Sequence, residues 1–109
     1  MIRLIHWNID EAKERATTIL ALGYKVDYSP FTIQSIRELN KHPPEAIMID
    51  LSRLPSQGRD VAANLGQYDS LRIVPFIFVG GDPEKVALIK KIFPHLTYGD
   101  WPGIAASLK

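Results

Sequence analysis

The residues of this chain that could do chemistry share one position, because each stands directly after a short apolar run. They are His6, Trp7, Asn8, Asp50, Gly80, Gly81, Asp82, Asp100 and Trp101. Asp50 matters most, since a carboxylate held among polar groups can serve as a nucleophile or as a ligand for a hard cation. The alternative is that Asp50 only ends a strand and accepts backbone N–H groups of its own loop. The elements around these residues bear on that choice.

Apolar and amphipathic patterns alternate along the chain. Short apolar runs predict strands at residues 2–7, 24–28, 45–50, 73–81 and 95–100. Amphipathic patterns predict helices at residues 10–22, 32–42, 58–72, 82–93 and 103–109. Five strands that alternate with five helices predict a single α/β domain, residues 1–109, with a parallel sheet and helices on both faces. In such a sheet the carboxyl ends of the strands form the edge where functional sites gather.

Single residues predict where some of these elements begin and end. Asp10 is expected to cap the first helix, and Gly23 to end it. The segment 51–58, which contains a proline and a glycine, is expected to form a loop after Asp50. Gly66 is expected to interrupt the third helix, whereas Asp82 is well placed to cap the fourth.

The composition excludes several classes of function. With a formal net charge of +1, the chain has no bulk attraction for nucleic acid or for an anionic membrane. It contains no cysteine, which excludes disulfides, thiolate metal sites and cysteine nucleophiles. No apolar run approaches the length that spans a membrane, and the N-terminal segment is too polar for a signal peptide. We therefore expect a cytoplasmic protein.

Three motifs stand in one register along the chain. The stretch MIDLSRLPSQG, residues 48–58, places an aspartate at the end of a strand, with a proline and a glycine after it. The stretch ALGYKV, residues 21–26, joins the end of the first helix to the second strand, and Tyr98 stands three places before Trp101–Pro102. Over essentially the whole chain this order resembles a response-regulator receiver domain. In that family the aspartate that ends the third strand accepts a phosphoryl group.

The resemblance has consequences for the fold and for single residues. It implies a flavodoxin-like, three-layer sandwich with a five-stranded parallel sheet in strand order 2-1-3-4-5. It implies that Asp50 is the equivalent of the phosphoacceptor. In receivers an aromatic switch residue stands three places before a lysine–proline pair whose peptide bond is cis. Tyr98 is therefore similar to the switch residue, and Pro102 is a candidate cis-proline.

The chain departs from the receiver pattern at the four other positions that hold magnesium and phosphate. The acidic pair after the first strand corresponds to His6 and Trp7, the serine or threonine after the fourth strand to Gly80, and the lysine to Trp101. Magnesium prefers carboxylate oxygens and water, which neither His6 nor Trp7 supplies. An acyl phosphate on Asp50 would lack the cations that stabilise its charge. The chain therefore resembles a pseudo-receiver, and we favour a loop-capping role for Asp50.

From this resemblance we expect an atypical signalling domain of a two-component or phosphorelay system. It would act through protein–protein interaction, independently of phosphorylation and magnesium, and would not be an enzyme. We expect no catalytic residue, metal or cofactor, no direct contact with nucleic acid and no membrane association. The expected partners are proteins, with a homodimer through residues 83–109 as one form. The degenerate pocket is expected to comprise His6, Trp7, Asn8, Gly80, Tyr98, Trp101 and Pro102.

Within that pocket, we expect His6 to form a hydrogen bond with Asp50 and Trp101 to fill the former phosphate site beside Trp7. Two other functions remain open. A small-ligand-binding module of flavodoxin-like shape would use both tryptophans and Gly80–Gly81. A phosphoacceptor receiver would use Asp50 in an unusual pocket. An open pocket at the sheet edge would favour the first alternative, and stable labelling by acetyl phosphate the second.

Overall fold

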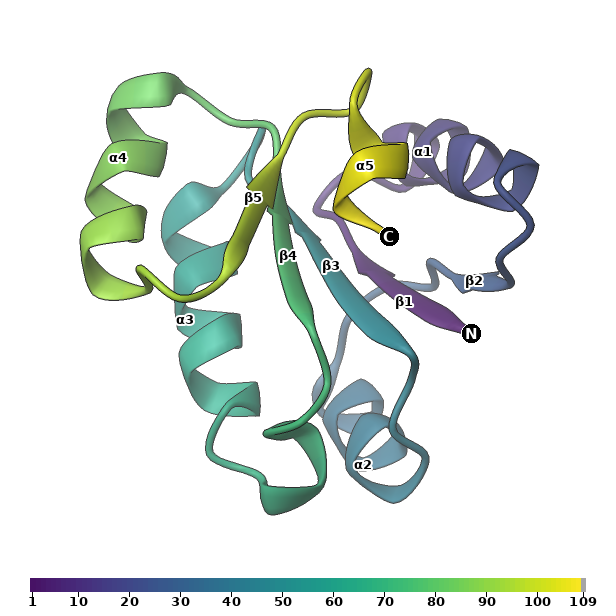
Figure 1. Ribbon diagram of the computed structural model, residues 1–109. Helices are drawn as coiled ribbons and strands as arrows, with labels where there is room; N and C mark the ends of the chain where they lie inside the picture. The colour runs from purple at the N-terminus through teal and green to yellow at the C-terminus, as the bar shows by residue number, and fades with distance from the viewer. Residues whose placement is uncertain (109) are drawn as a thin grey trace.

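A computed structural model describes residues 1–108 of the chain (Figure 1). One parallel sheet has the strand order β2-β1-β3-β4-β5. Its strands are β1 (Ile2–Ile5), β2 (Val26–Asp27), β3 (Ala46–Asp50), β4 (Phe76–Val79) and β5 (Thr97–Gly99). The helices are α1 (Ile9–Ala21), α2 (Ile33–Lys41), α3 (Pro55–Leu65), α4 (Pro83–Ile92) and α5 (Ile104–Ser107), with a 3-10 turn η1 at Asp69–Leu71. This confirms the predicted α/β fold class and strand order, and it is consistent with a flavodoxin-like fold.

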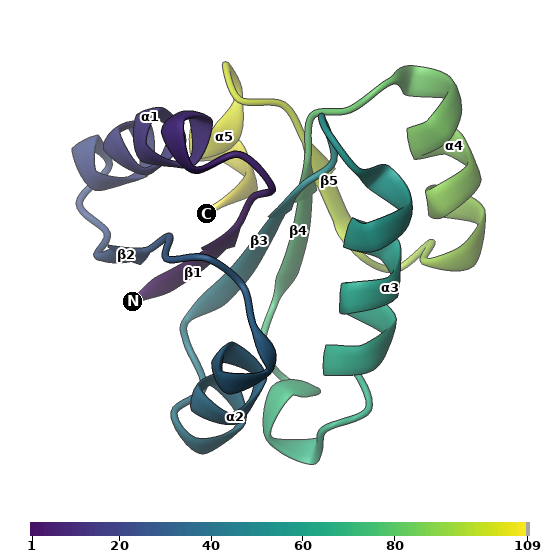
Figure 2. The same ribbon diagram turned by 180° about the vertical axis from the view of Figure 1, so that it is seen from behind.

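Helices cover both faces of the sheet. Residues of α2, α3 and α4 contribute to one buried cluster, and residues of α1 and α5 contribute to the other. Two opposite views show the same grouping, with α3 beside α4 on one side and α1 beside α5 on the other (Figures 1 and 2). Among residues 1–108, no helix is long and apolar enough to cross a membrane.

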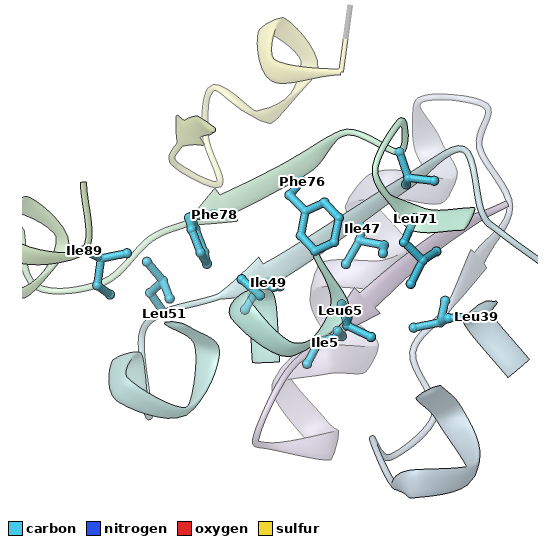
Figure 3. Packing of buried hydrophobic residues seen from close by; sticks show 12 residues of the cluster. Ile5, Leu39, Ile47, Ile49, Leu51, Leu65, Leu71, Phe76, Phe78 and Ile89 are labelled. Carbon is cyan, nitrogen blue, oxygen red and sulfur yellow. The ribbon is translucent and has the colours of Figure 1, made fainter. Parts of the chain in front are cut away.

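The central strand β3 supplies both clusters. All five of its residues are buried. Side chains alternate between the two faces of a strand, so Ile47 and Ile49 pack toward α3, whereas Met48 packs in the opposite cluster. Figure 3 shows Ile47 and Ile49 within the first cluster, together with Phe78 of β4. A strand covered on both faces needs an almost continuous apolar sequence, which is the pattern that predicted β3.

Two helices begin at residues other than those predicted. The first is capped by Asn8 and not by Asp10, because the Asn8 side chain accepts the backbone N–H of Glu11 at 3.0 Å. The third begins at Pro55, inside the segment predicted as a loop, since proline lacks an N–H and suits the first position of a helix. Gly66 ends that helix as its C-cap and does not interrupt it.

The predicted helix ends at Gly23 and Asp82 are confirmed. Gly23 has a φ of +95° directly after the C-cap of α1, a left-handed conformation that glycine adopts without steric cost. The Asp82 side chain accepts the backbone N–H of Glu84 at 2.9 Å and so caps α4.

The register of the strands decides which residues meet at the carboxyl edge. Asp50 pairs with Val79 of β4, and Val79 pairs with Gly99 of β5. Ile5 of β1 pairs with Ile49, so His6 follows β1 at the level of Asp50. The edge therefore brings together residues that are far apart in sequence.

Candidate functional site

Asp50 is enclosed at the carboxyl edge of the sheet. Its exposed fraction is 0%, and both of its carboxylate oxygens accept hydrogen bonds. Oδ2 accepts the indole N–H of Trp101 at 2.7 Å, and Oδ1 accepts the backbone N–H of Ser52 at 2.8 Å. The second bond closes an Asx turn within its own loop. Neutral donors therefore take both oxygens, in place of a cation.

Trp101 covers the carboxylate from the α5 side. Only 6% of its surface is exposed, and it packs in the buried cluster that contains Val79 and Ile104. The guanidinium carbon of Arg15, on α1, lies 5.1 Å from the centre of the indole ring. That distance allows a cation–π contact on the ring face. The indole is therefore fixed by packing, by Arg15 and by its bond to Asp50.

His6 approaches the same carboxylate from β1. Its side chain is 1% exposed, with Nε2 3.5 Å from Asp50 Oδ2 and 3.9 Å from Glu11 Oε2. The Nδ1 atom accepts the backbone N–H of Asn8 at 3.1 Å, so in the neutral ring the proton sits on Nε2 and faces both carboxylates. A separation of 3.5 Å is longer than a normal hydrogen bond, so the predicted hydrogen bond between His6 and Asp50 is not formed.

Glu11 and Arg53 form the outer layer of the site. Arg53 Nε donates to Glu11 Oε2 at 2.8 Å, and both side chains are partly exposed. This hydrogen bond holds the pKa of Glu11 below its ordinary value of 4.5, with further contributions from the charges of Arg53, His6 and Arg15. Glu11 therefore lies between His6 and Arg53, on the solvent side of the site.

Gly80 sits where the receiver pattern has a hydroxyl residue. Its φ is +73°, a conformation that strains other residues. A Cβ added there would lie 2.9 Å from Ser52 Oγ and 3.9 Å from both Asp50 Oδ2 and Trp101 Cδ1. Glycine therefore suits this backbone conformation and avoids a clash with Ser52 Oγ, whereas the distances to Asp50 and Trp101 are ordinary contacts.

Trp7 differs from Trp101 in both position and bonding. It is half-buried and packs against the cluster on the α3 side of the sheet, so it is not part of the cluster that holds Trp101. Its indole N–H is buried without a hydrogen-bond partner in residues 1–108. A buried donor without a partner costs about 1–3 kcal/mol. Of the two tryptophans, only Trp101 forms a hydrogen bond with Asp50, and the two indoles pack in different buried clusters.

Three further residues predicted for the pocket form no hydrogen bond with Asp50. Asn8 caps α1. Tyr98 packs on Phe78 with ring centres 5.3 Å apart, and its hydroxyl donates to the backbone carbonyl of Phe93 at 2.8 Å. Burial raises the pKa of Tyr98 above its ordinary value of 10.0. The candidate cis-proline is wrong, because no peptide bond in the described chain is cis, that before Pro102 included.

The donor atoms at this site do not fit magnesium. Of the three positions that receivers use as ligands, only Asp50 offers carboxylate oxygens, and Trp101 and Ser52 already bond to them. His6 presents a nitrogen, and magnesium prefers hard oxygen ligands. Within residues 1–108, no group of three histidine, aspartate or glutamate side chains is arranged to hold a metal ion.

Two cavities of substantial volume do not reach Asp50 itself. One of about 400 Å³ runs beside α2 and includes Arg3, Asp27 and Glu38 in its lining. Another of about 510 Å³ lies between α3 and α4. Neither is lined by Trp101 or Gly80. The space that a small ligand would need is thus found at other surfaces.

Sequence reasoning missed four residues of the site. They are Glu11, Arg15, Ser52 and Arg53. Ser52 had a usable signal, since the residue two places after a buried aspartate often donates its N–H to that side chain. The other three point toward the site only because of how α1 and the segment after β3 are oriented, which the sequence pattern leaves open.

Comparisons of this chain with known protein families, with curated proteins and with solved structures find no match. The class of protein therefore has to be argued from the fold and from the geometry around Asp50.

Proposed function

We propose that this chain is a receiver-like signalling module that acts through protein–protein contacts, without phosphorylation and without magnesium. The flavodoxin-like strand order supports a receiver-like architecture, but many functions share that architecture. The proposal therefore depends on the site.

The hydrogen bond from Trp101 to Asp50 carries the proposal. A phosphoryl acceptor needs a carboxylate oxygen that can reach the donor phosphorus and cations that neutralise the transferred group. Here Oδ2 is 2.7 Å from an indole nitrogen, and the side chain is completely buried. An indole N–H gives one hydrogen bond and no positive charge, so it stabilises the free carboxylate but not an acyl phosphate.

The two alternative functions have less support. A small ligand that stacked on Trp101 would have to displace the packing of an almost fully buried indole. A phosphoacceptor mechanism would require Trp101 and the Asp50 loop to move apart before reaction. The two side chains that approach Asp50 Oδ2, Trp101 and His6, supply neither the lysine ammonium nor the acidic pair of a receiver.

The finer proposal of a homodimer through residues 83–109 has one supporting observation. In this segment Leu88 and Ile92 of α4 are more than half exposed. The shortness of α5, which spans only Ile104–Ser107, argues against a large interface. Sedimentation velocity over a range of concentrations tests it: a concentration-dependent dimer would support the homodimer, and a constant monomer mass would contradict it.

Labelling with acetyl phosphate tests the absence of phosphotransfer. We expect the intact mass of the chain to stay unchanged after incubation with acetyl phosphate and magnesium. Stoichiometric addition that hydroxylamine removes, and that the Asp50→Asn variant lacks, would overturn the proposal.

A further inference from the structure

A groove between α3 and α4 adjoins the Asp50 site and shares Arg53 with it. It encloses about 510 Å³. Its lining residues are Arg53, Leu54, Pro55, Ser56, Gln57, Arg59, Lys85, Leu88 and Ile89. Figures 1 and 2 both show the two helices side by side, at the end where the segment after β3 enters α3. The groove is thus bounded by secondary structure on both sides.

The apolar part of the groove is open to solvent. Leu88 is 62% exposed and Leu54 is 44% exposed, while Ile89 beneath them is buried. Ile92 is 56% exposed and follows Leu88 by one helical turn, so the apolar surface continues along α4. Exposed leucine and isoleucine side chains that gather beside a groove mark a surface suited to another apolar side chain.

The charged side chains that line the groove are all positive. Arg53, Arg59 and Lys85 line it, and no acidic residue does so among residues 1–108. The carboxylates that pair with the two arginines, Glu11 and Asp60, are not part of the lining. These exposed pairs contribute little to stability, so an incoming carboxylate can compete for the arginines at small cost. Lys85 forms no ion pair within the described chain.

We propose that the groove between α3 and α4 binds an acidic amphipathic helix of a partner protein. Two apolar side chains of the partner, spaced three or four residues apart, would contact Leu54 and Leu88. Flanking aspartate or glutamate side chains would pair with Lys85 and Arg59. This is the helix-in-groove mode of recognition, in which apolar anchors supply the affinity and the charges select the partner.

Other occupants fit the groove less well. Nucleic acid would gain little from an apolar floor without an aromatic side chain on which a base can stack. A second copy of the chain would have to present an acidic apolar surface, whereas α4 itself carries Lys85, Lys90 and Lys91. The charge of the lining therefore favours a partner of opposite charge.

The inference deepens the proposed function, since it names the partner surface of the same module and rests on that function. The two can fail separately. Labelling of Asp50 by acetyl phosphate would contradict a phosphorylation-independent module and leave the groove untouched. Failure of the groove to bind an acidic helix, with Asp50 unlabelled, would contradict this inference alone.

Selection from a displayed library of random 16-residue peptides, with the intact chain as bait, tests the inference. We expect the enriched peptides to carry net negative charge and apolar residues at helical spacing. We also expect Leu88→Ser and Lys85→Glu each to weaken binding of the best peptide by about tenfold or more. The effect of Lys85→Glu should shrink as salt concentration rises.

Two matched variants serve as controls. Ile73→Ser removes an isoleucine that is 90% exposed and lies outside the groove, and Lys91→Glu reverses a charge of α4 that does not line it. Neither should change the affinity. Enrichment of basic or uncharged peptides, no enriched family, or equal losses in the controls would overturn the inference. Binding to phosphatidylserine vesicles that depends on Lys85, without binding of acidic peptides, would also overturn it.

Discussion

The Asp50 pocket and the α3–α4 groove adjoin the same short stretch of chain, residues 50–57, yet they differ in what they leave free. Around Asp50 both carboxylate oxygens are bonded and the side chain is fully buried. In the groove, leucine side chains and cations face solvent. The Asp50 pocket therefore buries its polar group, whereas the groove exposes apolar and charged side chains to solvent.

This difference suggests a structural role for the Asp50 pocket and a recognition role for the α3–α4 groove. In an active receiver the carboxyl edge does the chemistry. We propose that in this chain the edge stabilises the domain and that the neighbouring surface binds the partner. Mutations should therefore divide in the same way, with losses of stability at the pocket and losses of binding at the groove.

The largest effect is expected from Trp101→Ala. Removing a buried indole and its hydrogen bond to Asp50 should lower the free energy of unfolding by about 3–5 kcal/mol. In contrast, Leu88→Ala in the open groove should change it by no more than about 0.5 kcal/mol. Urea unfolding of the two variants measures both values, and equal losses would remove the distinction between the two regions.

A matched pair of substitutions isolates the indole N–H. Trp101→Phe keeps an aromatic ring but removes a donor to a carboxylate, so we expect a loss of about 1.5–3 kcal/mol. Trp7→Phe removes a buried N–H that has no partner in the described chain, so stability should stay the same or rise. If Trp7→Phe cost as much as Trp101→Phe, ring packing and not the bond to Asp50 would explain both results.

A loss of intermediate size is expected from Asp50→Ala. The indole N–H of Trp101 and the backbone N–H of Ser52 would then lose their acceptors, at a cost of about 2–4 kcal/mol. Asp50→Asn keeps one acceptor oxygen and should cost about half as much. Thermal or urea unfolding gives both numbers. A more stable Asp50→Ala variant would show that the buried charge is poorly compensated and that its donors contribute little.

A smaller loss is expected from Gly80→Ala. The left-handed φ of +73° costs a non-glycine residue about 1–2 kcal/mol, and the new methyl group also crowds Ser52 Oγ. Gly23→Ala is the control, because Gly23 has a φ of +95° with no atom within 4 Å of the added Cβ. The excess loss at Gly80 over Gly23 measures how tightly the Asp50 pocket is packed, and no excess would mean that it is loose.

The smallest effect concerns the Glu11–Arg53 pair, which joins the two regions. The folded pKa of Glu11 lies below 4.5, chiefly because of its hydrogen bond from Arg53. The pair therefore stabilises the fold above about pH 4.5, and this contribution is lost as pH falls through the lowered pKa. A carbon-detected NMR titration should show the pKa of Glu11 moving back toward 4.5 in Arg53→Ala. An unchanged pKa would show that the hydrogen bond from Arg53 does not lower the pKa of Glu11.

Much of the fold was predictable because it follows from periodicity. The apolar character of β3 and the alternation of strands with helices required only the side-chain pattern. The strand order came from the receiver resemblance and not from the pattern. The start of α3 was missed because proline and glycine in 51–58 indicate a loop. In fact Pro55 suits the first helical position, and a Cβ on Gly58 would lie 2.8 Å from Leu51 and 3.0 Å from Ile49.

The Asp50–Trp101 contact was predictable in part. The receiver register predicted that Trp101 lies near Asp50, and its indole N–H donates to the Asp50 carboxylate. The register could not decide the side of the sheet on which Trp7 packs, since residues beyond the end of a strand no longer follow its alternation. The contacts of Arg15 and Glu11 depend on the orientation of α1, which a pattern of apolar residues fixes only coarsely.

A magnesium titration followed on the indole N–H resonance of Trp101 tests whether the Asp50 carboxylate can bind a cation. The resonance is assigned by its loss in Trp101→Phe, and the Trp7 indole is the reference in the same spectrum. The Asp50 pocket described above predicts that the Trp101 signal keeps its position with magnesium in large excess, with or without beryllofluoride as a phosphoryl mimic. A saturable shift of that signal, absent from Trp7 and lost in Asp50→Asn, would show that the carboxylate exchanges its indole donor for a cation and would contradict the account.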